Sequence, residues 1–166
     1  MNISASMNKK DVDYKAIMES IEFIKKHEVL IGIPEDTANR KDKKGIPINN
    51  AELLFIHTNG SPIKGIPARP VLEPAIKQDN QNQGNVSNNM KKAIDAALTG
   101  NKGAIMQALE ITGMEGQNVA RDFFTSSTNG FAPNKPRTIK QKGSDRPLID
   151  TDEMRKSITY VVREVR

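Results

Sequence analysis

Histidine, serine and acidic side chains are the groups of this sequence that could carry out catalysis. The two histidines, His27 and His57, lie far apart along the chain, and neither belongs to a spaced metal-binding or nucleophile motif. Ser126 and Ser127 lack a neighbouring signature of an activated nucleophile. The absence of cysteine excludes a thiol nucleophile, a disulfide framework, a zinc ribbon and an iron–sulfur site. The sequence therefore predicts a protein that is not an enzyme and has no catalytic residue, metal site or cofactor.

One acidic run, Asp150-Thr151-Asp152-Glu153, has enough carboxylates to bind a cation. It lacks the alternation and the glycine of an EF-hand loop. Asp150 can instead cap a helix that has Glu153 in its first turn, and we expect this capping role rather than a metal site. The glycines of the chain follow no phosphate-loop pattern.

Two basic clusters are the candidates for binding an acidic partner. Residues 40–44 read RKDKK within an expected loop and could touch phosphates, although a solvated loop without a partner is the simpler explanation. The second cluster is looser and consists of Lys135, Arg137, Lys140, Lys142 and Arg146. No aromatic stacking platform is interleaved with either cluster, so specific base readout is not expected. Non-specific contact with a DNA backbone remains open.

The length and composition of the chain predict one domain with an aliphatic core. The 166 residues can bury roughly 70% of the surface that the unfolded chain exposes. Aromatic residues make up only 4%, so aliphatic side chains and seven methionines must fill the interior. The net charge of +5 permits an acidic partner without requiring one. No apolar run approaches the roughly 18 residues of a membrane span and the N-terminus lacks a signal core, so we expect a soluble, cytoplasmically made protein.

Apolar periodicity, together with residues that begin and end helices, predicts mostly helical structure. The expected helices cover residues 11–26, 51–57, 71–77, 89–98, 104–124, 138–142 and 151–156. β-Branched runs predict strands over 28–33 and 158–165. Residues 53–56 could alternatively form a buried strand, and residues 78–89 are expected to be an insertion or a weakened helical turn.

These elements predict the fold class α+β, a single domain with a small, mostly antiparallel sheet packed with several helices and with long loops. Residues 1–10 are expected to be a flexible N-terminus and residues 11–166 the domain. The two strands form the sheet, and a hairpin from the loops is expected to extend it. Gly113 and Gly116 lie inside the longest helix at a cost in helix stability, so we expect close-packing positions or a kink there.

Two blocks of the sequence have a specific order of residues. The first reads AELLFIHTNG over residues 51–60 and IPARPVLEPA over residues 66–75. The second, more specific block reads FAPN over 131–134, TIKQKGSDRPLIDT over 138–151 and MRKSITYVV over 154–162. These blocks resemble those of phage neck and tail-completion proteins, a family that serves long-tailed phages and prophages and is related in role to the minor tail protein Z of phage lambda. The chain departs from the family pattern at packing and turn positions, where the family's usual residue is replaced by Asn50, Thr58, Val71 and Asp152.

The resemblance implies a structural virion protein of the phage neck. Such a protein forms a homo-oligomeric ring, expected here to be a hexamer, that joins the head connector to the tail. Its expected partners are further copies of itself, the adjacent head-completion proteins and the tail-terminator or tail-tube proteins. Genomic DNA passing through the channel is a further expected partner, and a membrane is not. The protein is expected to be synthesised in the bacterial host cytoplasm and located in the virion, and the family brings no catalytic residue to carry over.

Loops and connectors supply the expected contacts of such a ring, over residues 35–48, 62–70 and 125–147. Arg69 is expected to be a charge-assisted hydrogen-bonding anchor, either within the fold or across a subunit boundary. The candidate interface or DNA-channel contacts are Arg40, Lys41, Lys43, Lys44, Arg69, Arg137, Lys140 and Arg146.

A second class of function fits the same residues. The alternative is a cytoplasmic assembly helper, or a non-specific DNA-binding protein, that is not retained in the virion. Salt-dependent binding of arbitrary DNA is the expected property of that alternative.

Overall fold

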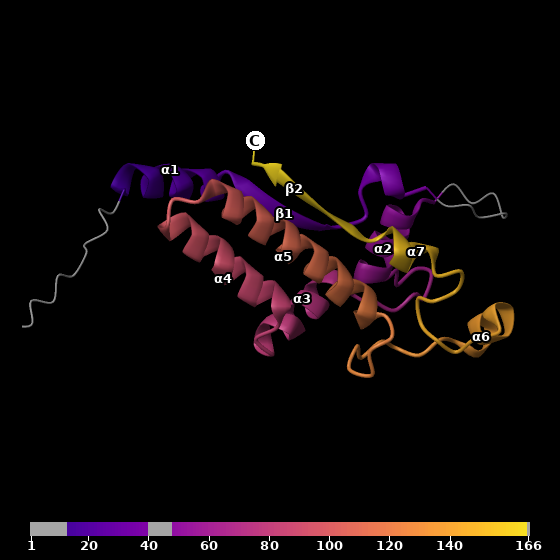
Figure 1. Cartoon of the computed structure of the whole chain (residues 1–166). Coiled ribbons are helices and arrows are strands. Elements are labelled where there is room, and N and C mark those ends of the chain that lie inside the picture. Colours follow the sequence, from indigo (N-terminus) through magenta and orange to yellow (C-terminus); the bar gives the residue numbers. More distant parts are fainter. Residues whose placement is uncertain (1–12, 40–47, 166) are drawn as a thin grey trace, which may run out of the picture.

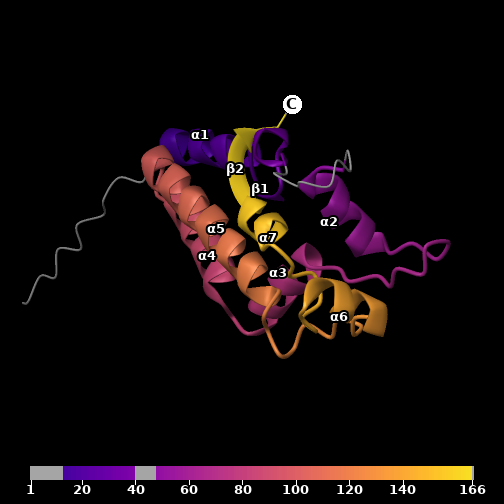
Figure 2. The same cartoon turned by 90° about the vertical axis from the view of Figure 1, so that its right-hand side faces the viewer.

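The computed structural model describes residues 13–39 and 48–165, and within these ranges the fold is α+β, as predicted. Its elements are α1 (Tyr14–Lys25), β1 (His27–Gly32), the 3-10 helix η1 (Glu35–Thr37), α2 (Asn50–Asn59), α3 (Leu72–Gln81), α4 (Asn85–Leu98), α5 (Lys102–Phe123), α6 (Pro136–Lys142), α7 (Glu153–Ser157) and β2 (Thr159–Glu164). Figures 1 and 2 show an elongated arrangement, with α1 at one end and α2 and α6 at the other. The flexible N-terminus expected for residues 1–10 lies outside the described residues.

The sheet consists of two antiparallel strands from opposite ends of the sequence. β1 pairs with β2 along its whole length, starting with His27 opposite Glu164. Both strands lie within one residue of their predicted bounds. This ribbon packs on α5, and Leu30 and Val161 are exposed on it. α5 therefore covers one face of the ribbon, while the apolar side chains of Leu30 and Val161 are exposed to solvent.

The connector between α2 and α3 contains one tight turn. Ser61 and Ile66 donate backbone hydrogen bonds to each other's carbonyls at 2.8 and 2.9 Å, and Gly65 takes a φ of 59° inside the turn. We expected a hairpin from the loops to extend the sheet, but among the described residues the loops form only this single bridge. Pro62 and Pro67 flank it and lack the N–H groups that a longer ladder would need.

A helical hairpin of α4 and α5 builds one apolar cluster, and the two helices run side by side in both views (Figures 1 and 2). Alanines let the helices approach closely, while two larger side chains fill the space between them. The buried members are Ala93, Ala96, Ala97, Ile105, Ala108 and Leu109. α1 packs on the same hairpin. Gly100, in the turn between α4 and α5, has a φ of 74° and lies so close to Ala16 of α1 that a Cβ on residue 100 would not fit.

Two glycines of α5 let the sheet approach the helix. A Cβ on Gly113 would lie within 3.0 Å of the Tyr160 ring, and one on Gly116 would come as close to Ile31. α5 continues without interruption from Lys102 to Phe123. Close packing, the first of the two roles expected for these glycines, therefore explains both.

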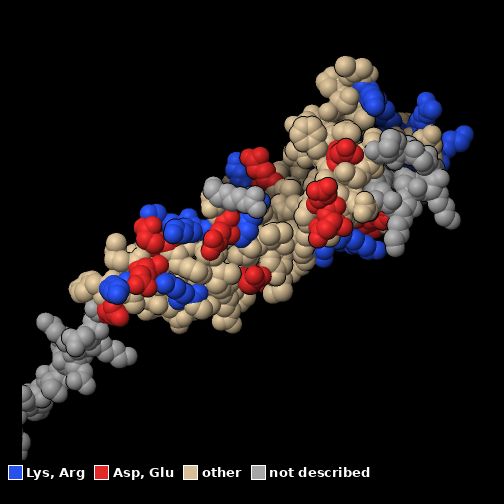
Figure 3. All heavy atoms as spheres, turned by 90° about the horizontal axis from the view of Figure 1, so that it is seen from above, with Lys and Arg blue, Asp and Glu red and all other residues tan. Residues whose placement is uncertain are grey.

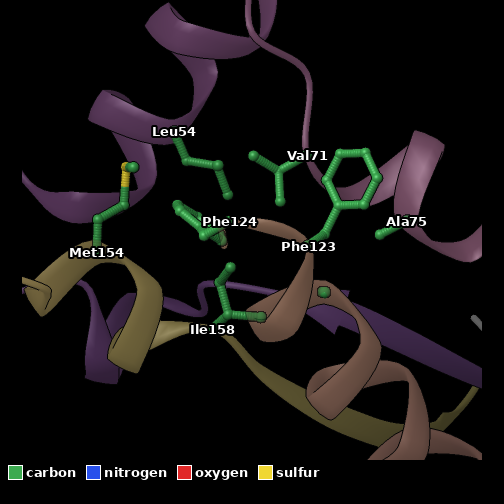
Figure 4. Close-up of a cluster of buried hydrophobic side chains, with 8 residues drawn as sticks. Leu54, Val71, Ala75, Phe123, Phe124, Met154 and Ile158 are labelled. Carbon is green, nitrogen blue, oxygen red and sulfur yellow. The ribbon is translucent and has the colours of Figure 1, made fainter. Parts of the chain in front are cut away.

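A second apolar cluster joins α2, α3, the C-terminal end of α5 and α7 (Figure 4). Its buried members are Leu54, Val71, Ala75, Ala120, Phe123, Phe124, Met154 and Ile158. Side chains from the first family-like block thus pack against side chains from the second.

α2 is a helix, and the alternative strand over residues 53–56 is wrong. The side chain of Asn49 accepts a hydrogen bond from the Glu52 N–H, and the Glu52 carboxylate accepts one from the Asn49 N–H, each at 2.8 Å. This reciprocal pair is a capping box and fixes the start of the helix. Gly60 ends it with a φ of 72°.

The expectation of an insertion or weakened turn over residues 78–89 is wrong. α3 continues to Gln81 and α4 begins at Asn85, so only a short turn separates two regular helices. The Asp79 carboxylate accepts a hydrogen bond from the Val86 N–H at 3.1 Å and secures the first turn of α4. Most asparagine and glutamine side chains of this stretch are exposed, which is why apolar periodicity did not reveal the helices.

The prediction that Asp150 caps α7 is wrong as well. The helix begins at Glu153, and Asp152 occupies the cap position with a φ of 65° and no side-chain cap hydrogen bond. Its carboxylate instead accepts hydrogen bonds from Nε and Nη2 of Arg155 at 2.7 and 2.8 Å. Glycine is the residue type that adopts this φ most readily.

Candidate functional site

The structure places only half of the candidate contact residues. The first basic cluster lies outside the described residues, namely Arg40, Lys41, Lys43 and Lys44. Three further candidates are exposed on or just after α6, namely Arg137, Lys140 and Arg146. The remaining candidate, Arg69, is 6% exposed.

Arg69 is an anchor within the fold. Its Nε donates a hydrogen bond to the Ala132 carbonyl at 2.8 Å, and its Nη2 donates one to the Pro133 carbonyl at 3.0 Å. Its backbone N–H donates to the His57 carbonyl at 2.6 Å. Arg69 therefore ties the connector after α2 to the loop before α6, which is the first of the two roles expected for it. No ion pair joins its guanidinium to a carboxylate among the described residues.

A pocket of about 380 Å³ opens beside Arg69, between α2, the turn after it, α6 and α7. Four cationic side chains line it, namely Lys64, Arg69, Lys135 and Lys142. Its apolar lining comes from Leu53, Ile66, Pro67, Leu148 and Met154. Asp150 is the only carboxylate among its lining residues. We call this hollow the Arg69 pocket.

His57 lines the same pocket with a half-buried ring whose Nδ1 is buried and has no hydrogen-bond partner among the described residues. The pKa of His57 is lowered, first because burial disfavours the charged ring and then because of the positive charges of Arg69 and Lys142. The imidazole is therefore held toward its neutral form.

Lys142 is the half-buried cation of the pocket. Burial lowers its pKa, Asp150 opposes this shift, and Arg69 adds to it. Its Nζ donates one hydrogen bond to the Arg146 carbonyl at 2.7 Å, which leaves further N–H groups for a ligand. Lys140, two residues earlier on α6, is exposed and does not line the pocket.

The acidic run at 150–153 shows no sign of a cation site. Asp152 already pairs with Arg155 and, at 3.7 Å, with Lys156. Across residues 13–39 and 48–165, no group of three or more histidine, aspartate and glutamate side chains is placed to hold a metal ion. In the same ranges no helix combines the length and apolar character needed to cross a membrane.

The charged side chains are unevenly distributed over the face of the molecule shown in Figure 3. Figure 3 shows acidic and basic side chains intermixed toward the α1 end, whereas several basic side chains project from the opposite end with few acidic ones between them. The α6 region, which carries the second basic cluster of the sequence, lies at that opposite end (Figure 1).

No known protein family, curated protein or solved structure matches this chain.

Sequence reasoning identified part of the Arg69 pocket and missed the rest. Arg69 was expected to be an anchor, and Lys135 and Lys142 belonged to the second basic cluster, but nothing in the sequence linked them to one another. His57 and Lys64 were missed as lining residues. The available signal was weak, because it consisted only of basic residues flanking the proline-rich connector and the loop before α6.

Proposed function

We propose that this chain is a structural subunit of the neck of a long-tailed phage, assembled as a homo-oligomeric ring between the head connector and the tail. The packing of the two family-like blocks supports the proposal. Arg69 of the first block donates hydrogen bonds to the Ala132 and Pro133 carbonyls of the second. Asn50, which directly precedes the first block, donates from Nδ2 to Ser157 Oγ of the second block at 2.8 Å. The residues that carry the resemblance thus form one packed unit.

The observation that carries the proposal is the two-sided apolar character of α2. Leu54 is 6% exposed and faces the core, whereas Phe55 is 70% exposed. Phe55 and Ile56, with Ile48 and Ala51, line an apolar hollow of about 560 Å³ on the outside of the helix. Exposed apolar surface of this kind is typical of protein interfaces. A ring subunit needs such surfaces, since it must contact a neighbour on each side.

Detection of the chain in purified virions of the phage or induced prophage that encodes it tests the location. The full chain should also show a defined multiple of 18.4 kDa by native mass spectrometry, alone or together with the adjacent neck proteins. Phe55→Ser should reduce the assembled fraction, and Met114→Ser, which alters an exposed apolar residue of α5, should not. Absence from virions together with a purely monomeric mass would contradict the proposal.

The basic end of the molecule favours one alternative, an assembly helper or non-specific DNA-binding protein that leaves the particle. The exposed Arg137, Lys140 and Arg146 could contact a DNA backbone without reading bases. This alternative predicts retardation of arbitrary DNA that weakens steeply with salt, and no copies in purified virions.

A further inference from the structure

We infer that the Arg69 pocket is a binding site for an acidic peptide segment, in which a carboxylate of the peptide binds among the cations and a neighbouring apolar side chain packs on the pocket wall. This inference concerns the isolated chain and does not depend on the proposed place in the virion.

The first argument is the state of the Arg69 guanidinium. It has five N–H donors, and its hydrogen bonds within the described residues use only Nε and Nη2, on two carbonyls. Arg69 is only 6% exposed as a residue, and a largely buried cation without a paired anion is costly. An arriving carboxylate would supply the missing negative charge and accept hydrogen bonds from the remaining N–H groups.

The second argument is the charge of the surrounding walls. Lys64, Lys135 and Lys142 add three cations to Arg69, and Asp150 offsets only one of the four. A Cβ built on Gly65 would lie 2.8 Å from Lys135 Nζ, so this ammonium group lies beside the turn at the edge of the pocket.

The third argument is the apolar part of the lining, which favours a peptide over nucleic acid. Leu53, Leu148 and Met154 offer surface to an aliphatic side chain beside the carboxylate. A nucleic-acid strand instead needs an open track of cations with aromatic rings for its bases, and the pocket is lined by no phenylalanine or tyrosine. The exposed cations of α6 that could form such a track, Arg137 and Lys140, lie outside the pocket.

The test uses the full chain labelled with ¹⁵N at low ionic strength. The probes are the end-blocked peptide GLEDLG, its amide counterpart GLQNLG, inorganic phosphate and a thymidine oligonucleotide. GLEDLG should shift the amide resonances of Gly65, Asn134 and Leu148, and GLQNLG should bind about tenfold or more weakly, since it lacks the charge.

Two variants on the same helix provide the matched control. Lys142→Gln removes a pocket cation but keeps an N–H donor for the Arg146 carbonyl, and it should weaken GLEDLG binding about tenfold. Lys140→Gln removes the same charge outside the pocket and should change binding by no more than about twofold.

Three results would overturn the inference. They are equal binding of the two peptides, equal effects of the two lysine variants, and resonance shifts at the pocket caused by phosphate or the oligonucleotide but not by GLEDLG. The last result would assign the pocket to phosphate groups instead.

Discussion

At the scale of single residues, the His57 ring lies where its protonation is unfavourable. Its pKa is lowered by burial, then by Arg69 and Lys142, from an ordinary value of 6.5. Below that value the unfolded chain binds more protons than the folded chain, so the free energy of unfolding should fall as the pH drops through this range. The contribution is fully present above pH 6.5 and is lost toward the lower, folded-state pKa.

His57→Gln should make stability less dependent on pH. Urea unfolding at about pH 7.5 and about pH 5.5 measures the effect, which cannot exceed about 1.4 kcal/mol per pH unit for one group. The wild-type chain should lose more stability than the variant over this interval. Equal losses in the two proteins would show that His57 titrates in the folded chain as it does in the unfolded chain.

Asp152 combines a left-handed backbone with an ion pair, and two substitutions separate these features. Asp152→Gly and Asp152→Ala both remove the hydrogen bonds from Arg155, but only alanine keeps a Cβ at a φ of 65°. We therefore expect the alanine variant to be the less stable by about 1 kcal/mol in denaturant unfolding. A glycine variant as unstable as the alanine variant would mean that backbone strain is negligible at this position.

At the scale of elements, replacing a glycine inside a helix by alanine usually stabilises a protein, but at Gly113 of α5 we expect it to destabilise the protein. Gly113→Ala should improve helix propensity, yet its Cβ would press on the Tyr160 ring of β2, and overpacking of this kind costs about 1–3 kcal/mol. Gly103→Ala is the matched control, because the nearest atom to its new Cβ, Asn101 Oδ1, would be 3.5 Å away. This variant should raise the free energy of unfolding by up to about 1 kcal/mol. Thermal unfolding of the two variants should give shifts of opposite sign.

Elements could be predicted wherever local chemistry alone specifies them. The capping box of α2 joins residues that are neighbours along the chain, and the helix expected over residues 51–57 was confirmed. Gly113 and Gly116 could be singled out because glycine is costly inside a helix, and close packing was confirmed, but the Tyr160 and Ile31 side chains that explain it come from the distant strands. The helices across residues 78–89 could not be predicted, because their polar side chains lack an apolar face. The Arg69 pocket depends on the turn at 61–66 meeting α6, which is a tertiary contact that no local pattern encodes.

At the scale of the whole molecule, α5 runs through both apolar clusters and should make them unfold together. Ile105 and Leu109 lie in the cluster with α4, while Ala120 and Phe123 lie in the cluster with α2 and α7. If the chain is a single domain, as predicted, a substitution that destabilises one apolar cluster must also lower the stability of the other.

Leu109→Ala tests this coupling by creating a cavity in the α4–α5 cluster. The residue is 2% exposed, and truncation of such a leucine costs about 2–5 kcal/mol. In a cooperative molecule, amide hydrogen exchange should accelerate equally at Leu54 and Ala75 of the distant cluster, because the protection of these buried helical amides reports global unfolding. Leu98→Ala, at a position 55% exposed on α4, should leave these rates nearly unchanged. Faster exchange confined to α4 and α5 would instead show that the two clusters unfold independently and that the chain contains two folding units.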